Sequence, residues 1–228
     1  MISLFIRSYP PDFEWLRHSI HSMRKNLTGV DEKVLVVPDT CTEIPKYLYS
    51  FFDTVHRVRE THPGYIQQQL DKIRAYKYCK YDHILFSDSD CIYYQPFGAR
   101  CRIVNDKIIL PKTLYTSLPE AAQAWKEVVY MSTGLTSQYE YMRCLPMLHH
   151  AEVLRYLDND EHFNAYLTVV KDNQLSEFNA VGTLAEAKFQ HLYTFVDTEN
   201  TNQPIPTARQ YWSWGGITPD ILSEIERL

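Results

Sequence analysis

The residues best suited to chemistry are Asp88 and Asp90, two carboxylates one residue apart that directly follow a short apolar run. That run, residues 83–86, is typical of a buried strand in a covered sheet. Because alternate side chains of extended backbone point the same way, the sequence predicts that both carboxylates project together while Ser89 turns aside. Two ionised carboxylates this close repel each other unless a cation lies between them. The pair therefore predicts a Mg²⁺ or Mn²⁺ site that leaves coordination positions open to water and phosphates.

An Asp-x-Asp pair also occurs by chance, as a polar turn that closes a strand. Here the pair is followed by Cys-Ile-Tyr-Tyr at residues 91–94 and then by Pro96. With these flanks the sequence resembles the metal-dependent glycosyltransferases of the GT-A fold, in which a strand of the form hhhhDxDhhh delivers metal-binding carboxylates to a nucleotide-sugar donor. The resemblance is to small bacterial and phage members, and it implies that Asp88 and Asp90 are metal ligands.

A second motif precedes the acidic strand. Residues 64–72 read Gly-Tyr-Ile-Gln-Gln-Gln-Leu-Asp-Lys, and their apolar spacing predicts a helix over residues 64–80. Gln68 and Lys72 would share one face of it. The resembling glycosyltransferases carry a G-aromatic-x-x-Q-Q-x-x-K pattern at this place, which implies that Gln68, Gln69 and Lys72 bind the donor. The alternative is a solvated helix face with a tethered lysine.

The start of the chain predicts a β-α-β unit. Residues 2–6 favour a strand, residues 12–26 a helix that Asp12 caps, and residues 33–37 a second strand, so the two strands should be parallel. In the fold that the chain resembles, the end of the first strand cradles the nucleotide. The expected donor ligands here are Arg7, Ser8, Tyr9 and Ser89. A polar strand exit with no ligand is the alternative.

A third motif lies in the second half of the chain. Ser176 is expected to cap a helix with Glu177 in its first turn, where a carboxylate commonly just offsets the helix dipole. The segment resembles an S-E-aromatic-x-x-x-G segment of the same glycosyltransferases, near their acceptor side. The resemblance makes Glu177 the candidate catalytic base that deprotonates the acceptor hydroxyl if the reaction inverts the anomeric configuration. In a retaining reaction no base is required, and Glu177 would orient the sugar.

Two further assignments concern the second half. The resemblance implies a third metal ligand there, often a histidine, and His150 is the candidate, although His149 and His191 are hard to separate from it by sequence. Residues 210–216 form an aromatic, glycine-containing loop that can fold over a bound donor as a lid. Its Trp212 and Trp214 are the expected acceptor-binding residues.

Length and composition fit one domain. The chain has 228 residues, 45% of them hydrophobic, which is enough for one well-buried core. We predict a single α/β domain of GT-A type over residues 1–228, with a mixed, mostly parallel central sheet flanked by helices. Residues 1–100 would bind the nucleotide sugar, and residues 101–228 would form the acceptor side.

Charge and cysteine content indicate which partners and which cellular compartment to expect. The net charge of −5, without a Lys/Arg run, argues against binding of polymeric nucleic acid. Five cysteines, an odd number without a CxxC motif, favour reduced thiols in the cytoplasm. We expect neither a signal peptide nor a membrane span, because no charged leader or long apolar stretch is present.

The predicted function is transfer of a hexosyl or pentosyl group from a nucleoside diphosphate sugar, with UDP as the expected nucleotide, to a hydroxyl of a glycan or modified DNA base. One alternative is a phage-type enzyme acting on a hydroxymethylated DNA base, which needs only a local basic groove and a pocket for a flipped base. A nucleotidyltransferase usually has a Gly-rich, basic loop after the first strand, where this chain has Pro10 and Pro11. A non-catalytic sugar-binding module would have little need of the carboxylate pair.

Overall fold

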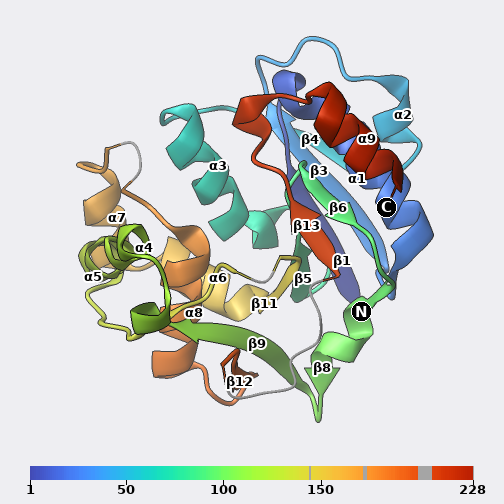
Figure 1. Ribbon diagram of the computed structural model, residues 1–228. Helices are drawn as coiled ribbons and strands as arrows, with labels where there is room; N and C mark the ends of the chain where they lie inside the picture. The colour runs from blue at the N-terminus through green and yellow to red at the C-terminus, as the bar shows by residue number, and fades with distance from the viewer. Residues whose placement is uncertain (144, 172–173, 200–206, 228) are drawn as a thin grey trace.

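A five-stranded sheet forms the centre of the computed structural model, which describes residues 1–143, 145–171, 174–199 and 207–227 (Figure 1). Its strand order is β11-β5-β1-β3-β4. The strands are β1 (Ile2–Arg7), β3 (Glu32–Pro38), β4 (Thr54–Val58), β5 (His83–Phe86) and β11 (Met147–His150). All neighbours pair in parallel except β11, which runs antiparallel to β5. The predicted mixed, mostly parallel sheet flanked by helices is confirmed.

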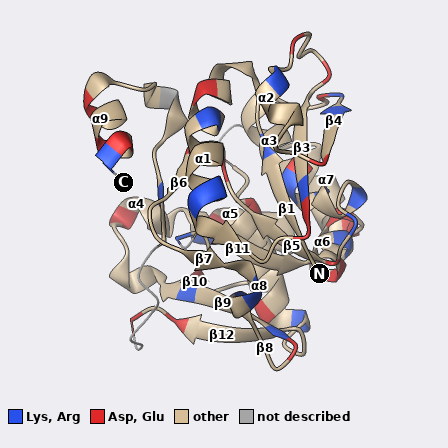
Figure 2. Ribbon diagram, turned by 90° about the vertical axis from the view of Figure 1, so that its right-hand side faces the viewer, with Lys and Arg blue, Asp and Glu red and all other residues tan. Residues whose placement is uncertain are grey.

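Helices cover both faces of this sheet. Figures 1 and 2 place α1 on one face and α3 on the other. The helices are α1 (Phe13–Asn26), α2 (Lys46–Tyr49), α3 (Gly64–Ile73), α4 (Glu120–Gln123), α5 (Trp125–Thr133), α6 (Ala151–Asp158), α7 (Glu161–Leu167), α8 (Glu177–Lys188) and α9 (Pro219–Arg227). Periodic apolar residues explain their packing: Leu16, Ile20 and Met23 of α1 are all buried at helical spacing.

Shorter strands build smaller sheets beside the central one. The hairpin of β8 (Ile103–Val104) and β9 (Lys107–Leu114) turns at Asn105 and Asp106, whose φ angles of 51° and 60° suit a tight hairpin turn. The apolar residues on either side of Asn105 and Asp106 predict two short strands around a turn, and the structure confirms them. Strand β9 also pairs with β10 (Tyr139–Glu140) and with β12 (Tyr193–Asp197). Two further pairs are separate: β6 (Cys91–Tyr93) pairs with β13 (Ala208–Gln210), and β2 (Leu27–Thr28) pairs with β7 (Phe97–Gly98).

Several predicted helices are shorter in the structure. The helix expected over residues 64–80 ends at Ile73, and a 3-10 turn, η2 (Ala75–Lys77), follows. The chain turns there because Arg74, Tyr76 and Lys77 all bind one carboxylate, that of Asp158. The sequence also favours a short helix over residues 44–52, of which only α2 forms, and a continuation of the helix after Ser176 to residue 191, which instead ends at Lys188.

Residues 117–120, Ser-Leu-Pro-Glu, have the spacing of a capping box, which predicts a helix start at Ser117, and this prediction was wrong. Ser117 lies in a 3-10 turn, η4 (Tyr115–Ser117), and α4 begins only after Pro119, without a side-chain cap. In the described part of the chain, none of the helices combines the length and the apolar character needed to cross a bilayer.

Candidate functional site

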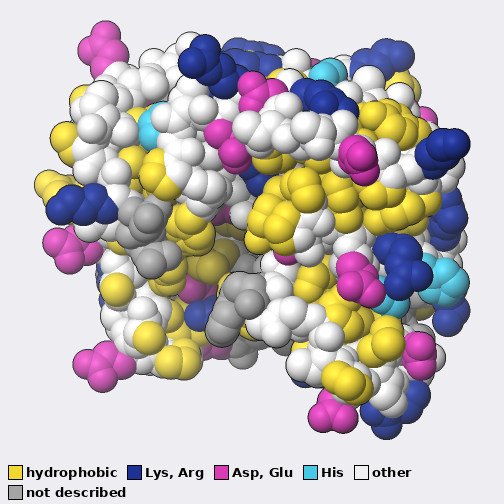
Figure 3. Space-filling view, turned by 90° about the horizontal axis from the view of Figure 1, so that it is seen from above, with side chains coloured by type: hydrophobic (Ala, Val, Ile, Leu, Met, Phe, Trp, Pro, Cys, Tyr) yellow, Lys and Arg dark blue, Asp and Glu magenta, His cyan; other side chains and the backbone are white. Residues whose placement is uncertain are grey.

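One cavity of about 680 Å³ brings together most of the residues that the sequence singled out. It opens at the carboxyl ends of β1 and β5, between α3, the start of α8 and the segment after β13. Figure 3 shows this face hollowed near its centre, with hydrophobic side chains along the walls. The predicted site residues that line it are Arg7, Tyr9, Gln68, Gln69, Lys72, Asp88, Ser89, Asp90, Glu177 and Trp212.

The Asp88–Asp90 segment is a turn rather than extended strand. Strand β5 ends at Phe86, and the backbone N–H of Cys91 donates to the carbonyl of Asp88 at 3.1 Å. Strand alternation therefore does not apply, and the prediction that Ser89 turns aside was wrong. All three residues line the cavity, and the Ser89 hydroxyl donates to Oγ of Ser8 at 2.9 Å. Ser8 itself is buried and does not line the cavity, and it contacts the cavity residue Ser89 through this bond.

The two aspartates hold unequal sets of partners. Oδ2 of Asp90 accepts the backbone N–H of Ser213 at 2.9 Å, and Oδ2 of Asp88 accepts the side-chain amide of Gln210 at 3.1 Å. Oδ1 of Asp90 is buried and has no hydrogen-bond partner in the described structure. Burial and the neighbouring charge of Asp88 raise the pKa of Asp90 to about 7. An orphaned carboxylate oxygen beside a second carboxylate fits a cation that would offset both charges.

Lys72 links this turn to α8. Its ammonium lies 2.7 Å from Oδ1 of Asp88 and 2.8 Å from Oε1 of Glu177, and 4.8 Å from the ring centre of Phe178. The residue is 4% exposed. Burial alone would lower the pKa of Lys72, but the two carboxylates outweigh it and raise the pKa. Lys72, Asp88 and Glu177, which the sequence analysis predicted in three separate segments, therefore form one cluster of charged side chains.

Glu177 is held by its backbone as well. Its N–H donates to Oε1 of Gln69 at 3.0 Å. Ser176 occupies the N-cap position of α8, but its hydroxyl points to the sulfur of Met142 at 3.8 Å, so the predicted Ser176 cap was wrong. Further along α8, a Cβ on Gly182 would stand 2.3 Å from the ring of Tyr141. The glycine of the predicted segment is thus explained by close packing against that ring.

Arg7 is already engaged by carboxylates. Its Nη2 lies 2.5 Å from Oε1 of Glu60, and its Nε donates to Oδ2 of Asp71 at 3.3 Å. The side-chain amide of Gln67 donates to the other oxygen of Asp71 at 2.8 Å. Sequence reasoning missed these partners. Glu60 lies 53 positions and Asp71 lies 64 positions from Arg7 along the chain, so no local pattern signals either contact.

The cavity carries an excess of negative charge. Among the described residues that line it, two cationic side chains, Arg7 and Lys72, face the carboxylates of Asp12, Glu60, Asp88, Asp90 and Glu177. Both cations are paired with carboxylates of that set. An anionic ligand would therefore meet net repulsion unless a metal cation accompanied it.

Asp12 and Gln210 are site residues that the sequence analysis assigned to other tasks or left out. Asp12 stands before α1 but makes no capping bond, lines the cavity instead, and has its pKa raised by burial. Its position just after the first strand was a usable signal, because ligands of such sheets sit at the carboxyl ends of the strands. Gln210 falls within the aromatic loop expected to cover the donor.

The predicted third metal ligand does not lie in this cavity. Strand β11 runs antiparallel to β5 and pairs His150 with His83, at the start of β5, whereas Asp88 follows the end of β5. Nδ1 of His150 accepts the N–H of Glu152 and so caps α6. The assignment of His150 to the metal was wrong because the direction of β11 is not readable from sequence.

The other two histidines do not replace it. His149 is fully buried, with neither ring nitrogen hydrogen-bonded in the described structure, and burial lowers its pKa to about 3. His191 is exposed and does not line the cavity. No cluster of three or more His, Cys, Asp or Glu side chains suited to a metal occurs among the described residues. Asp88 and Asp90 are thus the pair on which a metal site would rest.

The expected acceptor residues are placed in part. Trp212 lines the cavity and is 59% exposed, so its ring stands at the rim. It lies next to the 3-10 turn η5 (Ser213–Gly215), whose first N–H binds Asp90. The side chain of Trp214 lies outside the described part of the structure.

Comparison with known proteins bears on the fold. No protein-family model matches the chain, and no curated protein matches its sequence. Among solved structures, the glycosyltransferase GlyE of Streptococcus pneumoniae TIGR4 aligns with 99% of this chain at a TM-score of 0.51 and 10% sequence identity. The chain therefore has a fold like that of this glycosyltransferase. The apo form of GlyE aligns over 99% of this chain at a TM-score of 0.48 and 9% identity.

The likeness between this chain and GlyE is thus one of fold, at very low sequence identity. The chain spans 60% of the length of GlyE. At 10% identity the likeness concerns the fold, and the chemistry of this chain has to be argued from its own cavity.

Proposed function

We propose that this protein transfers a sugar from a nucleoside diphosphate sugar to an acceptor hydroxyl, with Mg²⁺ or Mn²⁺ held by Asp88 and Asp90. One observation carries the proposal: Oδ1 of Asp90 is buried, faces no hydrogen-bond donor in the described structure, and belongs to a residue that lines the cavity. A buried carboxylate oxygen without a partner is costly, and a hard cation is its natural ligand.

The charge of the cavity supports the same proposal. A bare diphosphate would meet more carboxylates than cations among the lining residues described above. When bound, the divalent metal supplies charge that offsets the departing diphosphate. The ammonium of Lys72, 2.7 Å from Asp88, stands beside that site and is placed to stabilise the same charge.

The donor would lie along the ends of β1 and β5. We assign Tyr9 to stacking against the base, and Gln68, Gln69, Lys72 and Ser89 to the diphosphate and sugar, since these side chains line the same cavity. Arg7 lies beneath Tyr9, with its guanidinium 5.9 Å from that ring. Because Arg7 already binds two carboxylates, we assign it the task of fixing Tyr9 and Glu60 rather than of binding a phosphate.

Glu177 is our proposed group at the reacting centre. Lys72 holds one of its oxygens and also holds Asp88, so one ammonium separates Glu177 from the proposed metal ligand. Oε2 of Glu177 makes no hydrogen bond to the described residues. In an inverting reaction this oxygen would take the proton of the acceptor hydroxyl. In a retaining one it would orient the sugar.

The acceptor would enter beside Trp212, whose exposed ring suits the apolar face of a sugar. Recognition of DNA would require a basic groove along the phosphates. Figure 2 instead shows Lys and Arg dispersed among Asp and Glu along the drawn elements. We therefore favour a glycan hydroxyl as acceptor over a modified DNA base.

Hydrolysis of donor sugars tests this function. Purified protein would be screened against UDP-, GDP- and dTDP-sugars with Mn²⁺ or Mg²⁺, with release of the sugar as the readout. We expect turnover of at least one donor, its loss in EDTA, and its return on adding metal. Turnover that persists in excess chelator would contradict the metal role, and absence of both turnover and binding for every donor would contradict sugar transfer.

A further inference from the structure

The oxygen and the nitrogen of the Gln69 side-chain amide differ in their hydrogen bonding. Gln69 is 4% exposed and lines the cavity from α3. Its Oε1 accepts the backbone N–H of Glu177 at 3.0 Å. That bond fixes the orientation of the amide, because only the oxygen can accept a proton. Nε2 therefore points elsewhere, and it is buried without a hydrogen-bond partner in the described structure.

The oxygen end supplies a cap that α8 lacks. The first N–H groups of a helix have no partner within the helix, and the residue before it usually provides an acceptor. Ser176 holds that position, but its hydroxyl goes to the sulfur of Met142. Gln69 meets the N–H of Glu177 from another helix instead. The place of Glu177 in the cavity therefore depends on α3.

The donors of the nitrogen end are not fully satisfied within the described structure. A buried donor without a partner is unfavourable, so its persistence on a cavity wall indicates a ligand atom. Tyr65 lies near the same amide: burial and the charge of Glu177 raise the pKa of Tyr65, and a side-chain hydrogen bond from Gln69 acts to lower it. The Tyr65 hydroxyl donates to the carbonyl of Leu175, and its oxygen can accept only one of the two N–H groups of Nε2, which leaves the other for a ligand.

The neighbouring charge selects the kind of ligand atom. A phosphate oxygen can accept from Nε2 but would face the carboxylate of Glu177, which repels it. A hydroxyl accepts from Nε2 and can also donate to the oxygen of Glu177 that Lys72 leaves unbound. The donor-acceptor pair of Gln69 and Glu177 therefore suits a neutral hydroxyl.

We propose that Gln69 is a positioning residue that holds Glu177 through its amide oxygen and recognises a hydroxyl of the bound sugar through its amide nitrogen. The recognition half rests on the proposed sugar transfer; the positioning half does not. Binding of that hydroxyl would complete the partners of Gln69 and tighten the contact between α3 and α8. Occupancy by the sugar and the placement of Glu177 are thereby coupled.

Gln69→Met tests both halves, with Ser176→Ala as the matched control on the same helix end. Without ligand, Gln69→Met should lower the melting temperature by about 2–4 °C, the effect of one lost buried hydrogen bond in a chain of this size. Ser176→Ala should leave it unchanged, unlike the loss of an ordinary N-cap. The reverse order, with Ser176→Ala the more damaging variant, would overturn the positioning half.

Calorimetry with Mn²⁺ tests the recognition half, using a nucleoside diphosphate with and without its sugar. Gln69→Met should weaken binding of the sugar-bearing form about tenfold, the scale of one hydrogen bond, and spare the sugar-free form. Ser176→Ala should bind both forms like the wild type. Equal weakening for both ligands would overturn hydroxyl recognition. Failure of the wild type to bind either ligand would instead overturn the proposed function, and the melting comparison would still decide the positioning half.

Discussion

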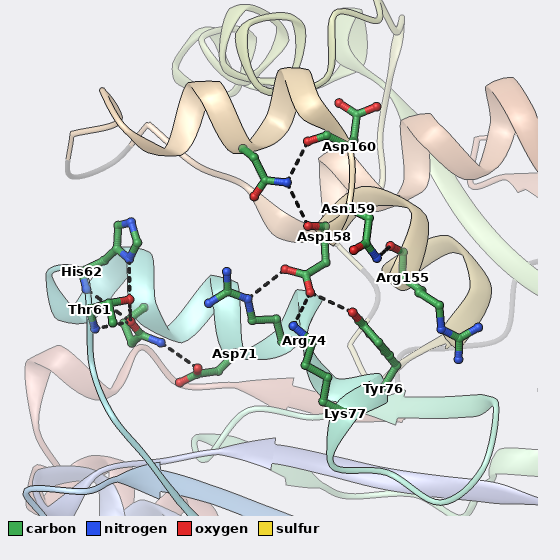
Figure 4. Close-up of polar contacts among 12 residues, drawn as sticks. Thr61, His62, Asp71, Arg74, Tyr76, Lys77, Arg155, Asp158, Asn159 and Asp160 are labelled. Carbon is green, nitrogen blue, oxygen red and sulfur yellow. Dashed lines mark hydrogen bonds and ion pairs between the residues drawn. The ribbon is translucent and has the colours of Figure 1, made fainter.

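Two carboxylate clusters lie along the same stretch of chain, α3 and η2, and they differ in how completely their atoms are paired. Around Asp158, three donors converge: Arg74 Nε at 2.8 Å, the Tyr76 hydroxyl at 2.8 Å and Lys77 Nζ at 2.5 Å (Figure 4). The cavity cluster around Lys72, one turn earlier, instead leaves buried atoms of its neighbours without partners, as at Asp90 Oδ1.

The difference in pairing suits a structural role for the Asp158 cluster and a ligand-binding role for the Lys72 cluster. A buried polar cluster whose members are all paired holds elements together, here α6 against the end of α3. Orphaned buried atoms cost stability, and where they belong to a residue that lines a cavity, as Oδ1 of Asp90 does, a ligand can complete them. The end of α3 is thus tied to α6 through Asp158, while Gln68, Gln69 and Lys72 of the same helix line the cavity.

The largest contrast is expected between two lysines five residues apart. Lys72→Met removes a buried ammonium from Asp88 and Glu177, and we expect turnover to fall roughly 10²–10³-fold, the scale of losing one charge-stabilising donor. Lys77→Met removes a half-exposed partner of Asp158, and we expect unchanged turnover with a loss of at most about 1 kcal/mol of stability. Donor hydrolysis and urea unfolding of both variants check this. Equal losses of turnover would erase the distinction between the clusters.

A smaller effect, on stability alone, is expected at Asp158. Asp158→Asn should cost about 2 kcal/mol of unfolding free energy at pH 7, because it weakens charge-assisted hydrogen bonds, and it should not alter turnover per folded molecule. Burial acts to raise the pKa of Asp158, but the bonds from Arg74, Lys77 and Tyr76 outweigh it and lower that pKa.

The sign of the pH dependence follows from that lowered pKa. The carboxylate binds protons less readily in the folded protein than in the unfolded chain, so its contribution is complete above the unfolded pKa of about 4 and is lost as the pH falls through the folded pKa. The stability gap between wild type and Asp158→Asn should therefore shrink below about pH 4. Urea denaturation at pH 7 and pH 3 measures it, and a gap that stays constant would contradict the assignment.

The sequence predicted elements whose signal is local. Apolar periodicity located β1, α1 and the first turns of α3, and the carboxyl end of β5 located Asp88 and Asp90. The grouping of that pair was right although its stated reason, strand alternation, was wrong, because the backbone turns after Phe86.

Contacts between distant segments could not be predicted in the same way. Lys72 meets Glu177 across 105 residues, and Gln69 meets the same residue across 108. His150 was misplaced because strand direction is set by packing of the whole sheet. Ser176 failed as a cap for a related reason: its sequence position was right, but another helix supplies the acceptor.

Metal-dependent binding of a nucleoside diphosphate, measured by calorimetry on wild type and Asp90→Asn, tests the central claim most directly. Asp90 is buried and partly unpaired, so we expect the Asp90→Asn variant to keep its fold, and thermal unfolding is the control that checks this. We predict that the wild type binds the nucleoside diphosphate only with Mn²⁺ or Mg²⁺, and that Asp90→Asn weakens this binding by more than about tenfold, or 1.4 kcal/mol. Equal binding by the two proteins, or wild-type binding that is indifferent to the metal, would contradict the account.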